Sequence, residues 1–155
     1  MIGIRNFSNL TSLLVAALFA SSAWAATAPV HTMPNCGCCT AYVKYLQKEG
    51  FDVTEKPAKS MKDMRALAHR MGVPKKHGDM KLPICHFTKI GDYLIVGHVP
   101  AKAIRRLLRE KPQGIKGIIL PGMPPGSPGM GGEKLEPFVV YAFDGHGKSW
   151  VYAKI

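Results

Sequence analysis

Four cysteines are the residues of this sequence whose type and spacing could support chemistry. Cys36, Cys38 and Cys39 lie close together, and Cys85 stands alone further along the chain. Thiolates are soft ligands that select copper(I), zinc or iron–sulfur clusters. A helix that begins at the three clustered cysteines would favour thiolates, because the positive end of a helix lowers thiol pKa values. The pattern predicts a metal site that uses all four sulfur atoms.

Disulfides are the first alternative, because an even number of cysteines in an exported protein commonly indicates them. A bond between the adjacent Cys38 and Cys39 is disfavoured, since bonded cysteines favour Cα atoms ~5.5 Å apart and neighbours are ~3.8 Å apart. A bond from Cys36 to either neighbour closes a very small loop and adds little stability. One bond to Cys85 leaves two thiols over. Two structural disulfides are therefore disfavoured.

The spacing also bears on which metal binds. Structural zinc sites commonly pair one CxxC motif with another, whereas here a CxCC motif is joined by a distant single cysteine. Three crowded sulfurs bind one ion awkwardly, and sulfurs that each bridge two copper(I) ions relieve the crowding. We therefore predict a polynuclear copper(I) site formed by Cys36, Cys38, Cys39 and Cys85. A structural zinc site is an alternative.

The other alternative is a redox enzyme. Metal binding without enzymatic activity is our first interpretation. Cys36 and Cys39 have the CxxC spacing of thiol–disulfide oxidoreductases, with Cys38 between them. In that case Cys36 would be the nucleophile and Cys39 the resolving thiol. Redox activity on copper itself would combine the two functions.

Four further side chains are candidate ligands. His98 lies at a predicted junction between a strand and a helix, where a hydrogen-bonded structural histidine is an equal alternative. His86 follows Cys85, but successive strand residues point to opposite faces, which weakens it as a co-ligand. Met123 and Met130 lie in a Pro/Gly-rich segment. Each could offer a thioether sulfur or simply cover the site.

The elements that position these residues follow from the spacing of apolar side chains. This spacing predicts helices over residues 40–49 and 60–71 and a third helix from Pro100 onward. Alternating runs bounded by turn residues predict strands at 51–54, 82–90, 93–96, 138–143 and 149–153. The prolines in 26–35 argue against a long strand there. Residues 116–132 predict an ordered loop folded over the domain rather than a flexible linker.

These elements predict an α/β fold: a single thioredoxin-like domain with a mixed sheet and flanking helices, over residues 26–155. The first 25 residues predict a signal peptide, because Arg5 precedes an apolar run and Ala23-Trp24-Ala25 provides a cleavage pattern. The run is shorter than the ~20 residues of a membrane span, although an uncleaved anchor is the alternative. We expect a periplasmic protein without membrane attachment after cleavage.

The chain is strongly basic. Its formal net charge is +11, and cleavage of the signal peptide removes only the charge of Arg5. Such an excess fits an anionic partner. The basic residues are scattered, however, and no aromatic-rich basic motif is present, so nucleic acid is not an expected partner.

The motifs together resemble the periplasmic copper-resistance CopG family, also described as domain of unknown function 411. They run in order across residues 34–153. They are Asn35-Cys36-Gly37-Cys38-Cys39, Ile84-Cys85-His86, Gly97-His98-Val99-Pro100, Leu120-Pro121-Gly122-Met123-Pro124 and Gly126-Ser127-Pro128-Gly129-Met130. One departure is Val30-His31-Thr32-Met33, where relatives often have a clear apolar strand.

The resemblance implies a thioredoxin-like fold and a copper cluster bridged by the four cysteines. It also implies a part in periplasmic copper resistance, with copper redox chemistry as one route. The expected partners are copper ions and other periplasmic copper-handling proteins.

Overall fold

The computed structural model describes residues 27–77 and 80–155. The predicted signal peptide therefore lies outside the described residues. The elements in chain order are β1 (Ala28–Thr32), α1 (Gly37–Lys48), β2 (Val53–Pro57), α2 (Met61–Arg70), β3 (Lys76–His77), β4 (Met80–Lys81), β5 (His86–Ile90), β6 (Tyr93–Val96), α3 (Ala101–Glu110), β7 (Gly117–Ile119), β8 (Val139–Phe143) and β9 (Ser149–Lys154).

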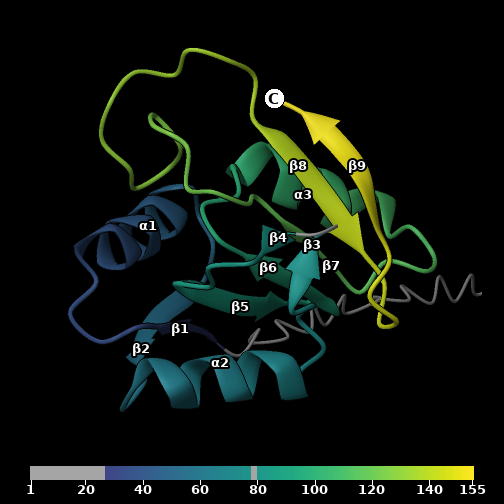
Figure 1. Ribbon diagram of the computed structural model, residues 1–155. Helices are drawn as coiled ribbons and strands as arrows, with labels where there is room; N and C mark the ends of the chain where they lie inside the picture. Colours follow the sequence, from purple (N-terminus) through teal and green to yellow (C-terminus); the bar gives the residue numbers. More distant parts are fainter. Residues whose placement is uncertain (1–26, 78–79) are drawn as a thin grey trace, which may run out of the picture.

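One open mixed sheet organises the described part of the chain (Figure 1). Its strand order is β2-β1-β5-β6-β7-β8-β9, with parallel pairing in β1–β2 and β6–β7 and antiparallel pairing elsewhere. A separate hairpin pairs β3 with β4. The predicted mixed α/β architecture is confirmed at this level. None of the helices in residues 27–77 and 80–155 has the length and apolar character needed to cross a membrane.

Helices cover both faces of this sheet. Tyr42 and Leu46 of α1 share one apolar cluster with Ile104 and Leu107 of α3. On the other face, Met64 of α2 is fully buried in a second cluster. Met64 is thus core packing, as expected for a residue type that fills irregular apolar gaps, whereas Met61 at the start of α2 is exposed. Ser60 caps the start of α2, because its side chain accepts a hydrogen bond from the Asp63 N–H at 3.1 Å.

Residues 26–35, where the prolines argued against a long strand and no strand was predicted, do form a strand of five residues. They contain β1, which lies between β2 and β5. Pro29 is tolerated because β5 pairs only with Val30, His31 and Thr32, so the missing N–H falls outside that ladder. His31 is accommodated by stacking on Phe87, with ring centroids 5.0 Å apart.

The segment predicted as one ordered loop, 116–132, divides into two parts. Its start forms β7, a buried strand that the neighbouring prolines and glycines concealed in the sequence. Gly117 fits there because an added Cβ would lie 2.6 Å from Cζ of Phe143. The rest is an ordered loop beside α1, as predicted (Figure 1). The loop's Gly129 packs directly on the backbone of Tyr42.

Candidate metal centre

The three clustered cysteines lie at the start of α1, as predicted. Cys36 is the N-cap residue, and the backbone N–H groups of Cys39 and Thr40 both donate to its carbonyl at 3.1 Å. Asn35 turns the chain from β1 into the helix with a φ of 56°. The Sγ atoms of Cys36, Cys38 and Cys39 all lie within 4.8 Å of one another. This group of soft donors is compact enough to share metal ions.

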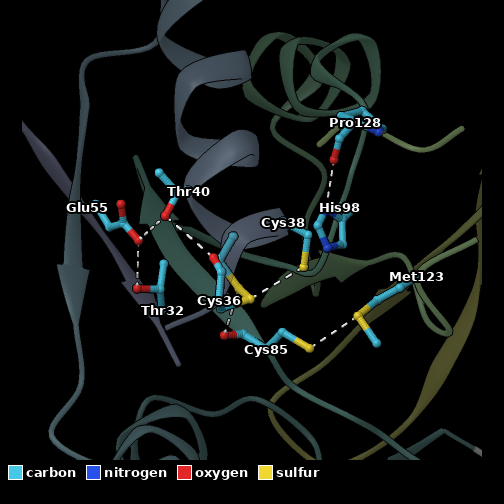
Figure 2. Close-up of a disulfide and its surroundings, with 10 residues drawn as sticks. Thr32, Cys36, Cys38, Thr40, Glu55, Cys85, His98, Met123 and Pro128 are labelled. Carbon is cyan, nitrogen blue, oxygen red and sulfur yellow. Dashed lines mark hydrogen bonds between the residues drawn. A yellow bond between two sulfur atoms is a disulfide. The ribbon is translucent and has the colours of Figure 1, made fainter. Parts of the chain in front are cut away.

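Cys36 and Cys39 form a disulfide, with Cα atoms 5.2 Å apart (Figure 2). A bond from Cys36 was expected to add little stability, yet this one is present, and it joins the pair that the redox interpretation named. Because α1 begins between Cys36 and Cys39, its first turn brings these two side chains together. Helix geometry therefore accounts for the bond, whereas the small stability gained by closing a short loop does not. Cys38 keeps a free thiol, and its Sγ lies 3.4 Å from Sγ of Cys36.

Cys85 joins the same place in the fold although it lies far along the chain. It packs with Cys36 and Cys39 in one buried cluster, against which Cys38 also packs. The Met33 N–H donates to the Cys85 carbonyl at 2.8 Å, which ties the segment before β5 to the end of β1. Burial raises the pKa of the Cys85 thiol, the nearby Cys38 adds to this effect, and Arg65 opposes it.

One of the two candidate methionines reaches this cluster. Met123 packs against it, and its Sδ lies 3.2 Å from the Cys85 Sγ (Figure 2). Met130 is not among the side chains that pack on it within the described part of the chain. Met33, which the sequence analysis did not single out, does pack there. The only sign of this contact in the sequence is that Met33 lies three residues before Cys36.

The two candidate histidines are buried beside α1. His98 lies between β6 and α3, as predicted, and its Nδ1 donates to the Pro128 carbonyl at 2.7 Å. Its ring lies 4.6 Å from that of His86, and the His86 ring lies 4.5 Å from that of Tyr42. Among the described residues, neither ring nitrogen of His86 nor Nε2 of His98 has a hydrogen-bond partner.

Burial keeps both imidazoles neutral. Desolvation, aided by His98, lowers the pKa of His86 to about 3. Desolvation also lowers the pKa of His98, although its hydrogen bond to the Pro128 carbonyl opposes the shift. With Nδ1 of His98 acting as donor, its Nε2 carries a lone pair, which is the form of imidazole that binds metals.

A small polar network braces the start of α1. Glu55 of β2 accepts hydrogen bonds through Oε1 from the hydroxyls of Thr32, at 3.2 Å, and Thr40, at 3.0 Å (Figure 2). These contacts join β1, β2 and the first turn of α1 next to Cys36. Nothing in the spacing of these three residues signals the network in the sequence.

The Tyr42 side chain packs against the rings of His86 and His98. Its buried hydroxyl donates to the Val99 carbonyl at 2.9 Å. Tyr42→Phe should lower the free energy of unfolding by about 1–2 kcal/mol, because it leaves a buried carbonyl unpaired. Urea unfolding measures the change. Tyr152→Phe is the matched control, since its buried hydroxyl has no partner among the described residues and its loss should be neutral or stabilising. Equal effects of the two substitutions would contradict this role for Tyr42.

Together these features define a class of protein: a small α/β domain that gathers four cysteines and a methionine at the start of its first helix. The family model described as "Protein of unknown function, DUF411" matches residues 82–130. Comparison with curated proteins gives no match.

Two solved structures resemble the chain over most of its length. They are described as "Copper resistance protein copG- Form 1" and "Form 2", each with 35% sequence identity and a TM-score of 0.69. Both alignments cover 83% of this chain, and they cover 95% and 96% of the two relatives. The chain belongs to the CopG copper-resistance family, as its motifs predicted.

Proposed function

We propose that this protein binds copper(I) in the periplasm and contributes to copper resistance. The observation that carries the proposal is the gathering of the Cys36, Cys38 and Cys39 sulfurs within 4.8 Å, with Cys85 in the same buried cluster. Thiolates prefer copper(I), and the structures with 35% identity are named copper resistance proteins. Copper is the cargo of this site, held by Cys36, Cys38, Cys39 and Cys85 as thiolates.

The finer points of the proposal are a polynuclear cluster, a thioredoxin-like fold, and export by a signal peptide over residues 1–25. The crowding of three sulfurs in the first turn of α1 supports bridging ligation. The helix that begins at a CxxC spacing supports the thioredoxin-like relationship. Export agrees with the basic, then apolar, composition of the first residues.

The reduced protein should hold more than one copper(I) ion per chain against a moderate chelator under anaerobic conditions. Cys85→Ser should hold fewer ions, because it removes one of the four thiolates without disturbing the first turn of α1. Metal analysis after desalting measures the stoichiometry. Complete loss of copper from the wild-type protein to the chelator would contradict the proposal.

A second candidate function, thiol–disulfide exchange, is favoured by the Cys36–Cys39 disulfide itself. A helix that starts between the two cysteines of a CxxC spacing is the arrangement that oxidoreductases use. Reduction of a model disulfide by the dithiol form would support this function, provided that Cys85→Ser leaves the rate unchanged. Loss of that activity in Cys85→Ser would instead tie the fourth cysteine to the chemistry.

A further inference from the structure

A basic pocket lies between α2 and the segment of chain that leads to Cys85. Its volume is about 470 Å³, which falls within the range of roughly 300–1,000 Å³ that is typical of small-molecule sites. Its lining combines basic and apolar side chains and contains neither an acidic residue nor a cysteine: Arg65, His69, Lys75, Lys76, Leu82, Pro83 and Ile84. The pocket is therefore separate from the sulfur cluster, and its charge favours an anion.

Hydrogen bonds hold two walls of this pocket in place. Arg65 and His69 lie four residues apart on α2 and so share one face of the helix. Nδ1 of His69 donates to the Val73 carbonyl at 3.1 Å, which fixes the ring and leaves Nε2 for a ligand. Across the pocket, the Leu82 N–H donates to the Lys75 carbonyl at 3.3 Å. The basic and the apolar parts of the lining are thus joined by the backbone.

The cations of the pocket have no acidic partner. Arg65, Lys75 and Lys76 are exposed, and none of them forms a salt bridge with another described residue. The arginines of α3, by contrast, are all paired with glutamates. Positive charges gathered around one pocket repel one another, and a bound anion would replace this repulsion by attraction.

The two kinds of side chain in the lining define the class of ligand. The planar guanidinium of Arg65 can bind a carboxylate or a phosphate through two parallel hydrogen bonds, and the lysines add point charges. Leu82, Pro83 and Ile84 supply an apolar surface. A bare inorganic ion would gain nothing from that surface, whereas the carbon skeleton of an organic anion would pack on it.

We propose that this pocket binds a small organic anion that carries two or more carboxylate or phosphate groups. The ligand would lie beside residues 82–84, directly before Cys85, without using any sulfur of the metal centre. This inference goes beyond the proposed copper-binding function and does not rest on it, because the site is complete in the metal-free protein.

Metal-free protein titrated with three probes tests the proposal. Citrate represents the carboxylates, fructose bisphosphate represents the organic phosphates, and inorganic phosphate represents the bare ion. Calorimetry should show saturable binding of at least one organic probe, and the methyl NMR signals of Leu82 and Ile84 should shift with it. The tighter organic probe identifies the oxyanion group that the pocket prefers, and inorganic phosphate should bind more weakly than that probe.

Exchange of single charges separates the pocket from the general positive charge of the chain. Arg65→Gln and Lys75→Gln should each weaken binding of the organic probe at least about tenfold, because each removes a charge-assisted hydrogen bond. Lys102→Gln is the matched control: it removes the same charge from an exposed position on α3, and the affinity should change less than about twofold. All three side chains are exposed, so the fold should tolerate their replacement.

Three results would overturn the inference. They are failure of both organic probes to bind, equal weakening by Arg65→Gln and Lys102→Gln, and binding of inorganic phosphate as tight as that of the better organic probe. None of these results bears on copper(I) binding by the reduced protein, so the proposed function is tested independently.

Discussion

Reduction of the Cys36–Cys39 disulfide is expected to raise the copper(I) capacity of this protein from at most one ion per chain to several. The disulfide ties up two of the three sulfurs that lie within 4.8 Å of one another. A sulfur in a disulfide carries no thiolate charge and is a poor ligand. Two electrons and two protons convert the pair into thiols, which ionise as they bind metal.

The measurement compares two samples of the same protein. One is kept oxidised, and the other is reduced and freed of reductant without exposure to air. Each is then titrated with copper(I) in the presence of a coloured chelator, and the metal retained is counted per chain. Mass spectrometry, with a difference of two hydrogen atoms, verifies the state of the disulfide.

Cys36→Ser is the matched control, because it cannot form this disulfide. Its copper capacity should be lower than that of the reduced wild type and should not depend on prior reduction. Equal capacities of the oxidised and reduced wild-type protein would show that Cys36 and Cys39 are not copper ligands. The Cys36–Cys39 disulfide would then belong to the thiol–disulfide exchange function instead.

The position of the cysteine trio could be predicted because its signals are local. Apolar residues at helical spacing begin just after Cys39, and the structure starts α1 at Gly37. The inclusion of Cys85 was predicted only from the chemistry of unpaired thiols and from family resemblance. No local pattern states that the residue before β5 packs on the first turn of α1.

Two strands of the seven-stranded sheet, β1 and β7, were not predicted, because pairing with neighbouring strands and not their own composition makes them strands. β1 carries Pro29 and His31, which break an apolar run, yet pairing with β2 and β5 holds it in the sheet. β7 is only three residues long and precedes a segment rich in proline and glycine. Its burial between β6 and β8 depends on contacts distant in sequence, which spacing rules do not capture.

The disulfide was misjudged for a different reason. Loop-closure entropy predicts little stability from a short loop, and that argument still holds for the unfolded chain. It does not address geometry, and the first turn of α1 places the Cα atoms of Cys36 and Cys39 5.2 Å apart. This separation lies within the range that a disulfide requires. The bond is therefore a consequence of the helix and reports on the chemistry of the site.

Gly129→Ala should lift the Pro/Gly loop away from α1 and destabilise the protein by about 3 kcal/mol. Gly129 has a φ of 80°, and an added Cβ would lie 2.7 Å from the Tyr42 nitrogen and 2.9 Å from the Cys38 carbonyl oxygen. Overpacking costs roughly 1–3 kcal/mol and the left-handed conformation roughly 1–2 kcal/mol more. The backbone of α1 cannot yield, so the loop must move.

Urea unfolding measures the loss of stability, and the rate of Cys38 alkylation reports on the docking of the loop. Movement of the loop breaks the hydrogen bond between His98 and Pro128 and removes Gly129 from its contact with Cys38. The loss of stability should therefore be accompanied by faster alkylation of Cys38. Gly131→Ala is the matched control: an added Cβ there meets nothing within 4 Å, and stability should change by less than about 0.5 kcal/mol. If both variants unfold at the same urea concentration, the contact of Gly129 with α1 does not hold the loop against the cysteine site.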